Sequence, residues 1–171
     1  GNEYHLAVVS ESMGEVTAST VAQRPVKFDK VTAEKPVWTG FESLTSVDYT
    51  ITDPPVDNYY IINFQSTKKQ DVLDHLIQPD AYTLLLVDSS FNGGQFSDSF
   101  VAATSDPLSD SVAISLASVG KEYFDYVRLK MENDLELVEV FSEPIQYPTN
   151  IRGGRGFFTL HLPDVWLMDF R

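Results

Sequence analysis

The chain of 171 residues contains no cysteine. Without thiols it can form neither a disulfide nor a Cys-ligated zinc site, and it cannot use a thiolate as a catalytic nucleophile. The absence does not identify a cellular compartment, because many exported proteins also avoid thiols. Evidence about location must therefore come from other features of the sequence.

Basic side chains are also scarce, with 12 Lys and Arg against 25 Asp and Glu, which gives a net charge of −13 at pH 7. An acidic surface repels phosphate backbones, so we expect no nucleic-acid partner. The acidic residues are spread along the chain, which favours a solvated surface over a cation or amine site. No apolar run reaches about 18 residues, and we therefore expect no membrane-spanning helix.

Hydrophobic residues make up 43% of the chain and aromatic residues 12%, which is enough for a substantial core. The length fits a single domain, residues 1–171. The run of apolar residues at 82–87 is typical of a central strand. Short β-prone segments occur at 4–9, 16–21, 26–31, 44–51, 59–64, 82–87, 96–102, 112–116, 157–162 and 165–170.

The hydrophobic period changes near residue 118, where it becomes helical. One face of this segment carries Val119, Tyr123, Tyr126, Val127 and Met131. The pattern predicts one α-helix near 118–132, with Ser118 as its N-terminal cap. Residues 65–80 allow a helical turn or a long loop, and residues 135–141 a helix tail or a strand. We therefore expect a mainly β fold, a β-sandwich or a partly open barrel of about nine or ten short strands with this one helix.

A glycine cluster, Gly153, Gly154 and Gly156, invites comparison with phosphate-binding loops. The Lys and Ser or Thr of a Walker loop are missing, and Thr159 stands where a dinucleotide fingerprint has its third glycine. The cluster is better explained by positive φ angles or a close backbone approach. Arg152 and Arg155 beside it either hold a carboxylate or form an ordinary surface pair.

The three histidines, His5, His75 and His161, lie far apart and lack the i, i+4 spacing of a helix-borne zinc site. A Ser-His-Asp triad can form from distant residues, but the Gly-x-Ser-x-Gly elbow that would support one does not occur. We expect no catalytic residue, no bound metal and no cofactor, and a hydrolase is the weaker alternative.

Two polar turns offer oxygen atoms to Ca²⁺, but neither has EF-hand spacing, and turn chemistry explains both more simply. They contain Asp53, Asp57 and Asn58, and Asp106 and Asp110. Four aromatic residues form either part of the core or a platform for stacking sugars. They are Trp38, Phe41, Trp166 and Phe170.

Several segments, in their order, resemble the Bacteroidetes-type envelope lipoproteins that carry a domain of unknown function and are commonly encoded beside TonB-dependent outer-membrane receptors. The similar segments are EYHLAVVSESMGEVTAST, DPPVDNYYIINF, DSSFNGGQF, SVGKEYFDYVRLKM and FSEPIQYPTNIRGGRGFF. The resemblance implies export and anchorage at the outer membrane through a lipidated cysteine, which this chain lacks. It also implies an additional N-terminal β domain, whose end residues 1–24 could form, and no catalytic residues.

We therefore expect a non-enzymatic lipoprotein domain, an accessory or binding component of a TonB-dependent uptake system. Its expected partners are a TonB-dependent receptor and a small nutrient, and it would meet the membrane only through the lipid anchor. A structural or adhesive module without a small ligand is the alternative. Proline-fixed loops present side chains at little entropic cost, which makes the two proline-containing loops the candidate interaction surfaces. Their residues are Asp53, Asp57, Asn58, Glu143, Tyr147, Asn150, Arg152 and Arg155.

Overall fold

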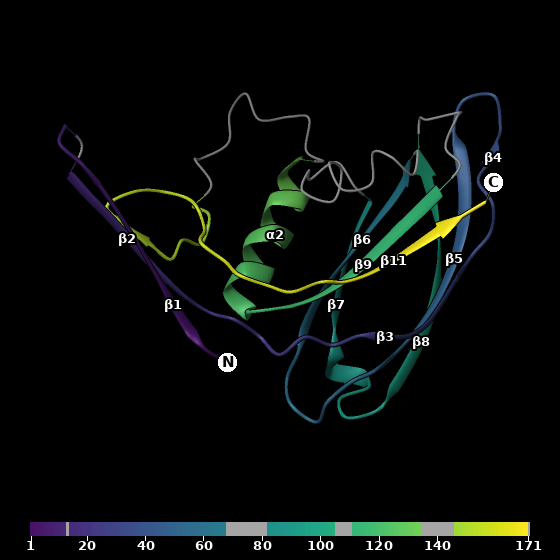
Figure 1. Cartoon of the computed structure of the whole chain (residues 1–171), viewed down its shortest axis with the longest axis horizontal. Helices are drawn as coiled ribbons and strands as arrows, with labels where there is room; N and C mark the ends of the chain where they lie inside the picture. Colours follow the sequence, from purple (N-terminus) through teal and green to yellow (C-terminus); the bar gives the residue numbers. More distant parts are fainter. Residues whose placement is uncertain (13, 68–81, 105–110, 135–145, 171) are drawn as a thin grey trace. The chain divides into compact units, whose positions relative to one another are not determined.

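A computed structural model describes residues 1–12, 14–67, 82–104, 111–134 and 146–170 of the chain. The described part contains eleven β-strands and a single α-helix, so the expected mainly β fold is confirmed (Figure 1). Contacts between Cα atoms divide the chain into two compact units. Unit 1 comprises residues 1–24 and 119–161, and unit 2 comprises residues 25–118 and 162–171.

Unit 2 is a β-sandwich of two sheets. The strands of the first sheet are, in order, β11 (Asp164–Asp169), β9 (Ser111–Val119), β6 (Tyr59–Thr67) and β7 (Tyr82–Val87). The second sheet consists of β3 (Phe28–Ala33), β4 (Val37–Trp38), β5 (Ser43–Thr52) and β8 (Gln95–Thr104). In this second sheet β3, β4 and β8 all pair antiparallel with β5. A 3-10 turn, η2 (Asp88–Ser90), follows β7.

The core of unit 2 lies between its two sheets. Strand β5 alternates strictly, so that Val47, Tyr49 and Ile51 are buried while the residues between them are not. This is the period of two that a strand with one core-facing side requires. From the other sheet, Tyr60 and Ile62 are fully buried in the same cluster.

The expectation that residues 82–87 form a central strand is wrong. Among the described strands, β7 lies at the edge of its sheet and pairs with β6. Its residues Leu84 and Leu86 are only partly buried against the core. Among the strands whose burial is described in full, β9 is buried at every position, and its serines stand among apolar residues. A run of apolar residues thus marked an edge strand, because sequence alone does not reveal how many neighbours a strand has.

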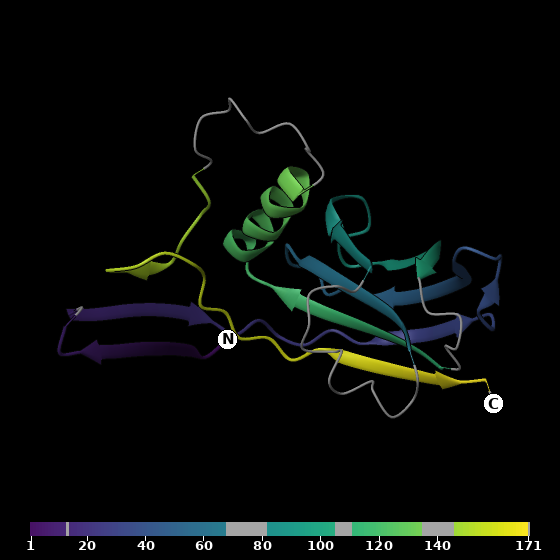
Figure 2. The same ribbon diagram turned by 90° about the horizontal axis from the view of Figure 1, so that it is seen from above.

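Unit 1 contains a three-stranded sheet and the helix. The order of strands is β1 (Glu3–Ser10), β2 (Gly14–Val21) and β10 (Ile151–Arg152), and the helix is α2 (Lys121–Asp134). Strands β1 and β2 form the expected hairpin, in which Glu3 faces Val21 and Ser10 faces Gly14. Figure 2 shows the two purple strands of this hairpin side by side. No helix in the described part of the chain is long and apolar enough to cross a membrane.

The helix starts later than expected, at Lys121 instead of residue 118. Ser118 cannot be its cap, because this residue belongs to β9 and its side chain is buried. The backbone N–H of Phe124 donates to the carbonyl of Gly120 at 3.0 Å, so the first helical turn begins at the glycine. The strand continues to Val119 because apolar and small residues there still follow the pleat of a buried sheet.

The strand expected at 157–162 is also absent. The backbone N–H and carbonyl of Phe158 bond to the side-chain amide of Asn150 and not to a neighbouring strand. The helical turn or long loop expected at 65–80 is wrong for its first residues, because residues 65–67 continue β6. The rest of that segment, from residue 68, and the expectation for residues 135–141 fall outside the described residues. The remaining β-prone segments correspond to strands, with boundaries shifted by a few residues.

Candidate functional site

The turn before β6 surrounds a buried carboxylate. Asp53 is 2% exposed, and its oxygens accept hydrogen bonds from the Tyr60 hydroxyl, the Gly93 N–H at 2.9 Å and the Asn58 amide at 3.3 Å. A charged group can be buried in this way only when donors replace its water. Burial and the nearby negative charge of Asp53 raise the pKa of Tyr60 far above its usual range. Asp53 therefore joins the turn to the sandwich and is not offered at the surface.

Asn58, in the same turn, is held equally firmly. Its backbone N–H donates to the buried carboxylate of Asp88 at 2.6 Å, and its side-chain amide donates to the carbonyl of Val56 at 2.5 Å. Asp57 is exposed and accepts a hydrogen bond from the Asn92 amide at 3.3 Å. The bond to Val56 is ordinary turn chemistry, in which an Asn side chain satisfies a nearby backbone group. The bonds with Asp88 and Asn92 join this turn to η2 and to the residues after it.

Neither proposed calcium turn gains support from the structure. Within the described ranges no group of three or more His, Asp or Glu side chains is placed to hold a metal ion. The oxygens of Asp53 already face donors, which leaves them poorly placed to bind a cation. Asp106 and Asp110 lie outside the described residues.

The second candidate surface lies on residues 146–161, which we call the basic segment. Asn150 fixes it to the sheet of unit 1. The amide nitrogen of Asn150 donates to the carbonyls of Ser19 at 2.8 Å and Phe158 at 2.7 Å, and its amide oxygen accepts from the N–H of Phe158 at 2.8 Å. One side chain thus ties both ends of the turn 150–158 together and to β2. Asn150 is therefore a positioning residue.

The glycine cluster allows this turn to approach β2 closely, as expected. Gly153 has a φ of +82°, and a Cβ atom there would lie 2.6 Å from the carbonyl oxygen of Glu15. Gly156 also has a positive φ, of +122°. Thr149 closes the turn by donating to the Gly156 carbonyl at 2.7 Å. The glycines thus serve the conformation of the backbone, which agrees with the interpretation of the sequence.

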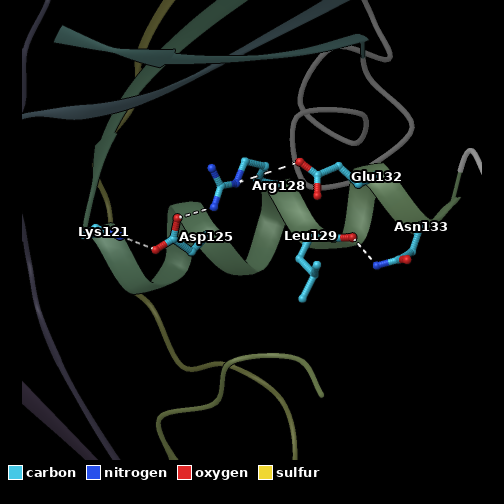
Figure 3. Close-up of polar contacts among 6 residues, drawn as sticks. All are labelled: Lys121, Asp125, Arg128, Leu129, Glu132 and Asn133. Carbon is cyan, nitrogen blue, oxygen red and sulfur yellow. Dashed lines mark hydrogen bonds and ion pairs between the residues drawn. The ribbon is translucent and has the colours of Figure 1, made fainter. Parts of the chain in front are cut away.

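Arg152 and Arg155 stand exposed on this turn. Within the described residues, neither guanidinium makes a hydrogen bond or an ion pair. Two cations of α2, by contrast, are paired: Asp125 bridges Lys121 at 2.5 Å and Arg128 at 3.1 Å, and Figure 3 shows both contacts. The two arginines of the turn are therefore available to a partner. Glu143, the remaining candidate before this turn, lies outside the described residues.

A hollow of about 660 Å³, which we call the larger hollow, lies between the sheet of unit 1 and the first turn of α2. Its lining includes two of the expected interaction residues, Asn150 and Arg152. The other lining residues are His5, Leu6, Ala7, Thr17, Ala18, Ser19, Glu122, Thr149 and Ile151. The larger hollow therefore gathers part of the second candidate surface and none of the first.

Aromatic rings attach the basic segment to the helix. Tyr123 contacts Phe157 and His161 with centroid distances of 5.4 and 6.0 Å, and Tyr126 contacts Tyr147 and Phe157 at 5.8 and 5.6 Å. Aromatic pairs prefer offset or edge-on geometry. They stabilise the packing by more than the burial of their apolar surface alone provides. Tyr147 remains 39% exposed. This candidate residue therefore packs against the helix and is also accessible at the surface.

The two described histidines, His5 and His161, make no contact with each other. His5 lies on the exposed hairpin, 3.9 Å from Glu3. His161 stacks on Tyr123, burial lowers its pKa, and its Nδ1 is buried without a partner in the described structure. His75 lies outside the described residues. A hydrolase would need a nucleophile about 3 Å from one of these rings, and the contacts of His5 and His161 supply none of this geometry in the described part of the chain.

The four aromatic residues considered for a sugar platform are divided between the sheets of unit 2. Trp38 and Phe41, at β4 and the turn after it, are 43% and 91% exposed. Trp166 and Phe170, at the other sheet, pack against the core. Sequence reasoning missed the contact between Tyr123 and Phe157, because the helical period marked Tyr123 only as part of an apolar face.

These features define a mainly β protein with a sandwich unit and a second unit in which a hairpin and a helix flank a polar hollow. Its sequence matches the model of the family described as "Domain of unknown function (DUF4249)" over residues 1–162, and the chain belongs to that family. No curated protein and no solved structure matches the chain significantly.

Proposed function

We propose that this chain is a non-enzymatic domain of a cell-envelope lipoprotein of the outer membrane, and that it assists a TonB-dependent receptor in uptake. Two lines support the proposal. The order of sequence segments resembles lipoproteins encoded beside such receptors, and the chain belongs to a family whose description carries no activity. The arrangement of unit 1 then suggests which surface meets the receptor.

The observation that carries the proposal is the charge of the basic segment. Residues 146–161 include Arg152 and Arg155 and no acidic residue, although the whole chain has 25 acidic residues and a net charge of −13. Both arginines are exposed and lack a partner in the described structure. An exposed basic site on an acidic molecule fits an acidic patch on a partner, because complementary charge steers association and sets orientation.

The turn that carries these arginines is fixed before any partner arrives. Asn150 makes three hydrogen bonds across it, and Gly153 lies against β2. A surface that is already ordered loses little conformational entropy on binding, which favours affinity. The proposed receptor contact is therefore Tyr147, Arg152 and Arg155, with Asn150 holding them in place.

The proposal is tested by co-purification of the full-length, tagged lipoprotein from detergent-solubilised native membranes, followed by mass spectrometry. We expect one TonB-dependent receptor in near-stoichiometric amount. The double variant Arg152→Glu with Arg155→Glu should lose most of the receptor, because repulsion replaces attraction at the contact.

The matched control is Arg24→Glu with Lys130→Glu, which changes the net charge equally at exposed positions outside the basic segment. It should retain the receptor. Recovery of the bait alone would overturn the proposal and favour a free-standing structural or adhesive module. Equal loss in both double variants would show that overall charge and not the basic segment controls the contact.

A further inference from the structure

A second hollow in unit 1, of about 330 Å³, combines aromatic rings with hydrogen-bonding side chains; we call it the aromatic hollow. Its volume falls within the range of about 300–1,000 Å³ that is typical of small-molecule sites. The lining residues are Ser19, Thr20, Val21, Gln23, Gly120, Lys121, Glu122, Tyr123, Asn150, Phe157 and Thr159.

Two rings in the lining, Tyr123 and Phe157, are fixed by packing. Their centroids are 5.4 Å apart, and both also contact Tyr126, at 6.1 and 5.6 Å. The hydroxyl of Tyr123 is protonated near neutral pH, as a tyrosine ordinarily is, and burial raises its pKa further. It can therefore both donate and accept a hydrogen bond. The hollow therefore has a rigid apolar wall with a polar group.

The polar groups in the same lining include several that make no hydrogen bond within the fold. In the described structure, the carboxylate of Glu122 and the hydroxyl of Thr159 make no hydrogen bond, and Gln23 uses only its amide nitrogen, toward the carbonyl of Val21 at 3.2 Å. They provide two acceptors and a hydroxyl that serves either way. Asn150, by contrast, is fully engaged in the turn.

The charges in the lining argue against an ionic ligand. The lining contains one ammonium group, that of Lys121, and one carboxylate, that of Glu122, so its formal charges sum to zero. The ammonium group already pairs with Asp125 at 2.5 Å, which makes it a weak attractant for an anion. This balance is notable in a chain with a net charge of −13, whose surface otherwise favours cations. Rings beside neutral donors and acceptors suit a molecule with apolar C–H surfaces and many hydroxyl groups.

We propose that the aromatic hollow binds a unit of a neutral carbohydrate. One sugar face packs on Tyr123 and Phe157, while its hydroxyl groups bond to Glu122, Gln23 and Thr159. The proposal gives a ligand class to the nutrient-capture role and in that respect rests on the proposed function. The aromatic and larger hollows share Ser19, Glu122 and Asn150, so further units of an oligosaccharide can continue past the first.

The test uses the isotope-labelled chain and NMR titration with defined probes at up to ~10 mM, because single-site sugar binding is commonly weak, with dissociation constants on the order of millimolar. The probes are oligosaccharides of two to six units from cellulose, starch, xylan, β-mannan and chitin. We expect at least one series to shift the resonances of Tyr123, Phe157 and Glu122 in a saturable way, with longer members binding more tightly.

Variants separate a binding site from surface effects. Tyr123→Leu and Glu122→Ala should each weaken the active series at least tenfold. Tyr4→Leu and Glu11→Ala are matched controls, since both residues are exposed in the hairpin outside the hollow, and they should bind normally. Glu122 is exposed and lacks a partner in the described structure, so its variant tests the site even if Tyr123→Leu fails to fold.

Three results would overturn the carbohydrate proposal: no saturable shift with any series, shifts that persist in both hollow variants, or stronger binding of putrescine or acetate than of every sugar. The titration does not involve the receptor. Sugar binding without receptor recovery would leave the ligand class standing and remove the uptake role, whereas receptor recovery without sugar binding would do the opposite.

Discussion

The hydroxyl of Tyr60 donates a hydrogen bond to the carboxylate of Asp53, and both residues are buried, with exposures of 0% and 2%. The bond joins the start of β6, where Tyr60 belongs to the core cluster, to the turn that precedes this strand. Because it lies inside unit 2, its contribution can be measured by the stability of the fold.

Removing this hydroxyl should destabilise the protein. In Tyr60→Phe the Asp53 carboxylate keeps the Gly93 and Asn58 donors but loses the hydroxyl of the tyrosine. A buried acceptor that lacks one of its donors lowers the free energy of unfolding by about 1–3 kcal/mol. The midpoint of urea unfolding should fall accordingly. Tyr82→Phe, at a side chain that is 42% exposed, is the matched control and should change the unfolding free energy by less than about 0.5 kcal/mol. Equal effects would contradict the role of the bond.

Stability should decline in strong base. Burial, with a smaller effect from Asp98, raises the pKa of Tyr49 to about 12 from the ordinary 10.0. Below pH 10 the tyrosine is protonated in both states, whereas between pH 10 and 12 the unfolded chain releases a proton that the folded chain retains. The unfolding free energy therefore falls by about 1.4 kcal/mol per pH unit for this group.

The comparison variant for this decline is Tyr49→Phe, studied by urea unfolding at pH 9.5, 10.5 and 11.5. This variant should reduce the slope of the unfolding free energy against pH by the contribution of one proton. Part of the decline should remain, because buried Tyr60 also has a raised pKa. An unchanged slope would show that Tyr49 titrates normally in the folded protein.

Mild acid should loosen the basic segment. Burial lowers the pKa of His161 below its ordinary value of 6.5, so the unfolded chain takes up a proton before the folded chain does. The contribution of neutral His161 to the free energy of unfolding is therefore present above pH 6.5. It is lost as the pH falls through the pKa of His161 in the folded chain. Between pH 7 and 5, His161→Phe should lose less thermal stability than the parent chain. His5→Phe, on the exposed hairpin, should follow the parent, and identical profiles for all three would contradict this prediction.

Gly153, in the turn 150–158, and Gly14, at the start of β2, offer a matched pair of variants. Gly14 and Gly153 have nearly equal φ angles, +84° and +82°, but a Cβ atom at Gly14 meets open space while one at Gly153 meets the Glu15 carbonyl. Gly14→Ala should cost about 1 kcal/mol of unfolding free energy from backbone strain alone. Gly153→Ala adds a steric clash, which typically costs about 1–3 kcal/mol more. Similar losses would show that the turn does not press against β2.

Much of the fold could be predicted from local patterns. The alternation in β5 and the turn between β1 and β2 are local signals, and both elements formed as expected. The errors arose where a distant partner decides the structure. The start of α2 depended on the buried sheet that retains Ser118, and Phe158 failed to form a strand because the Asn150 side chain binds its backbone.

The candidate site was only partly predictable for the same reason. The Asp53 turn has the composition of a surface loop, and nothing local reveals that Tyr60 covers its carboxylate. Arg152 and Arg155 could be found because charge and glycine content are visible in the sequence. The aromatic hollow could not, since Tyr123 and Phe157 meet only when the basic segment folds back on the helix.

The most direct test of the uptake role is photo-crosslinking in native cells. p-Benzoylphenylalanine replaces Tyr147 in the full-length lipoprotein, a conservative change at an aromatic residue that is 39% exposed on the basic segment. The control carries the same group in place of Tyr82, which is 42% exposed in unit 2. We expect a single adduct with a TonB-dependent receptor from position 147 and none from position 82. Adducts of equal yield at both positions, or none with a receptor at position 147, would contradict the proposed role of the basic segment.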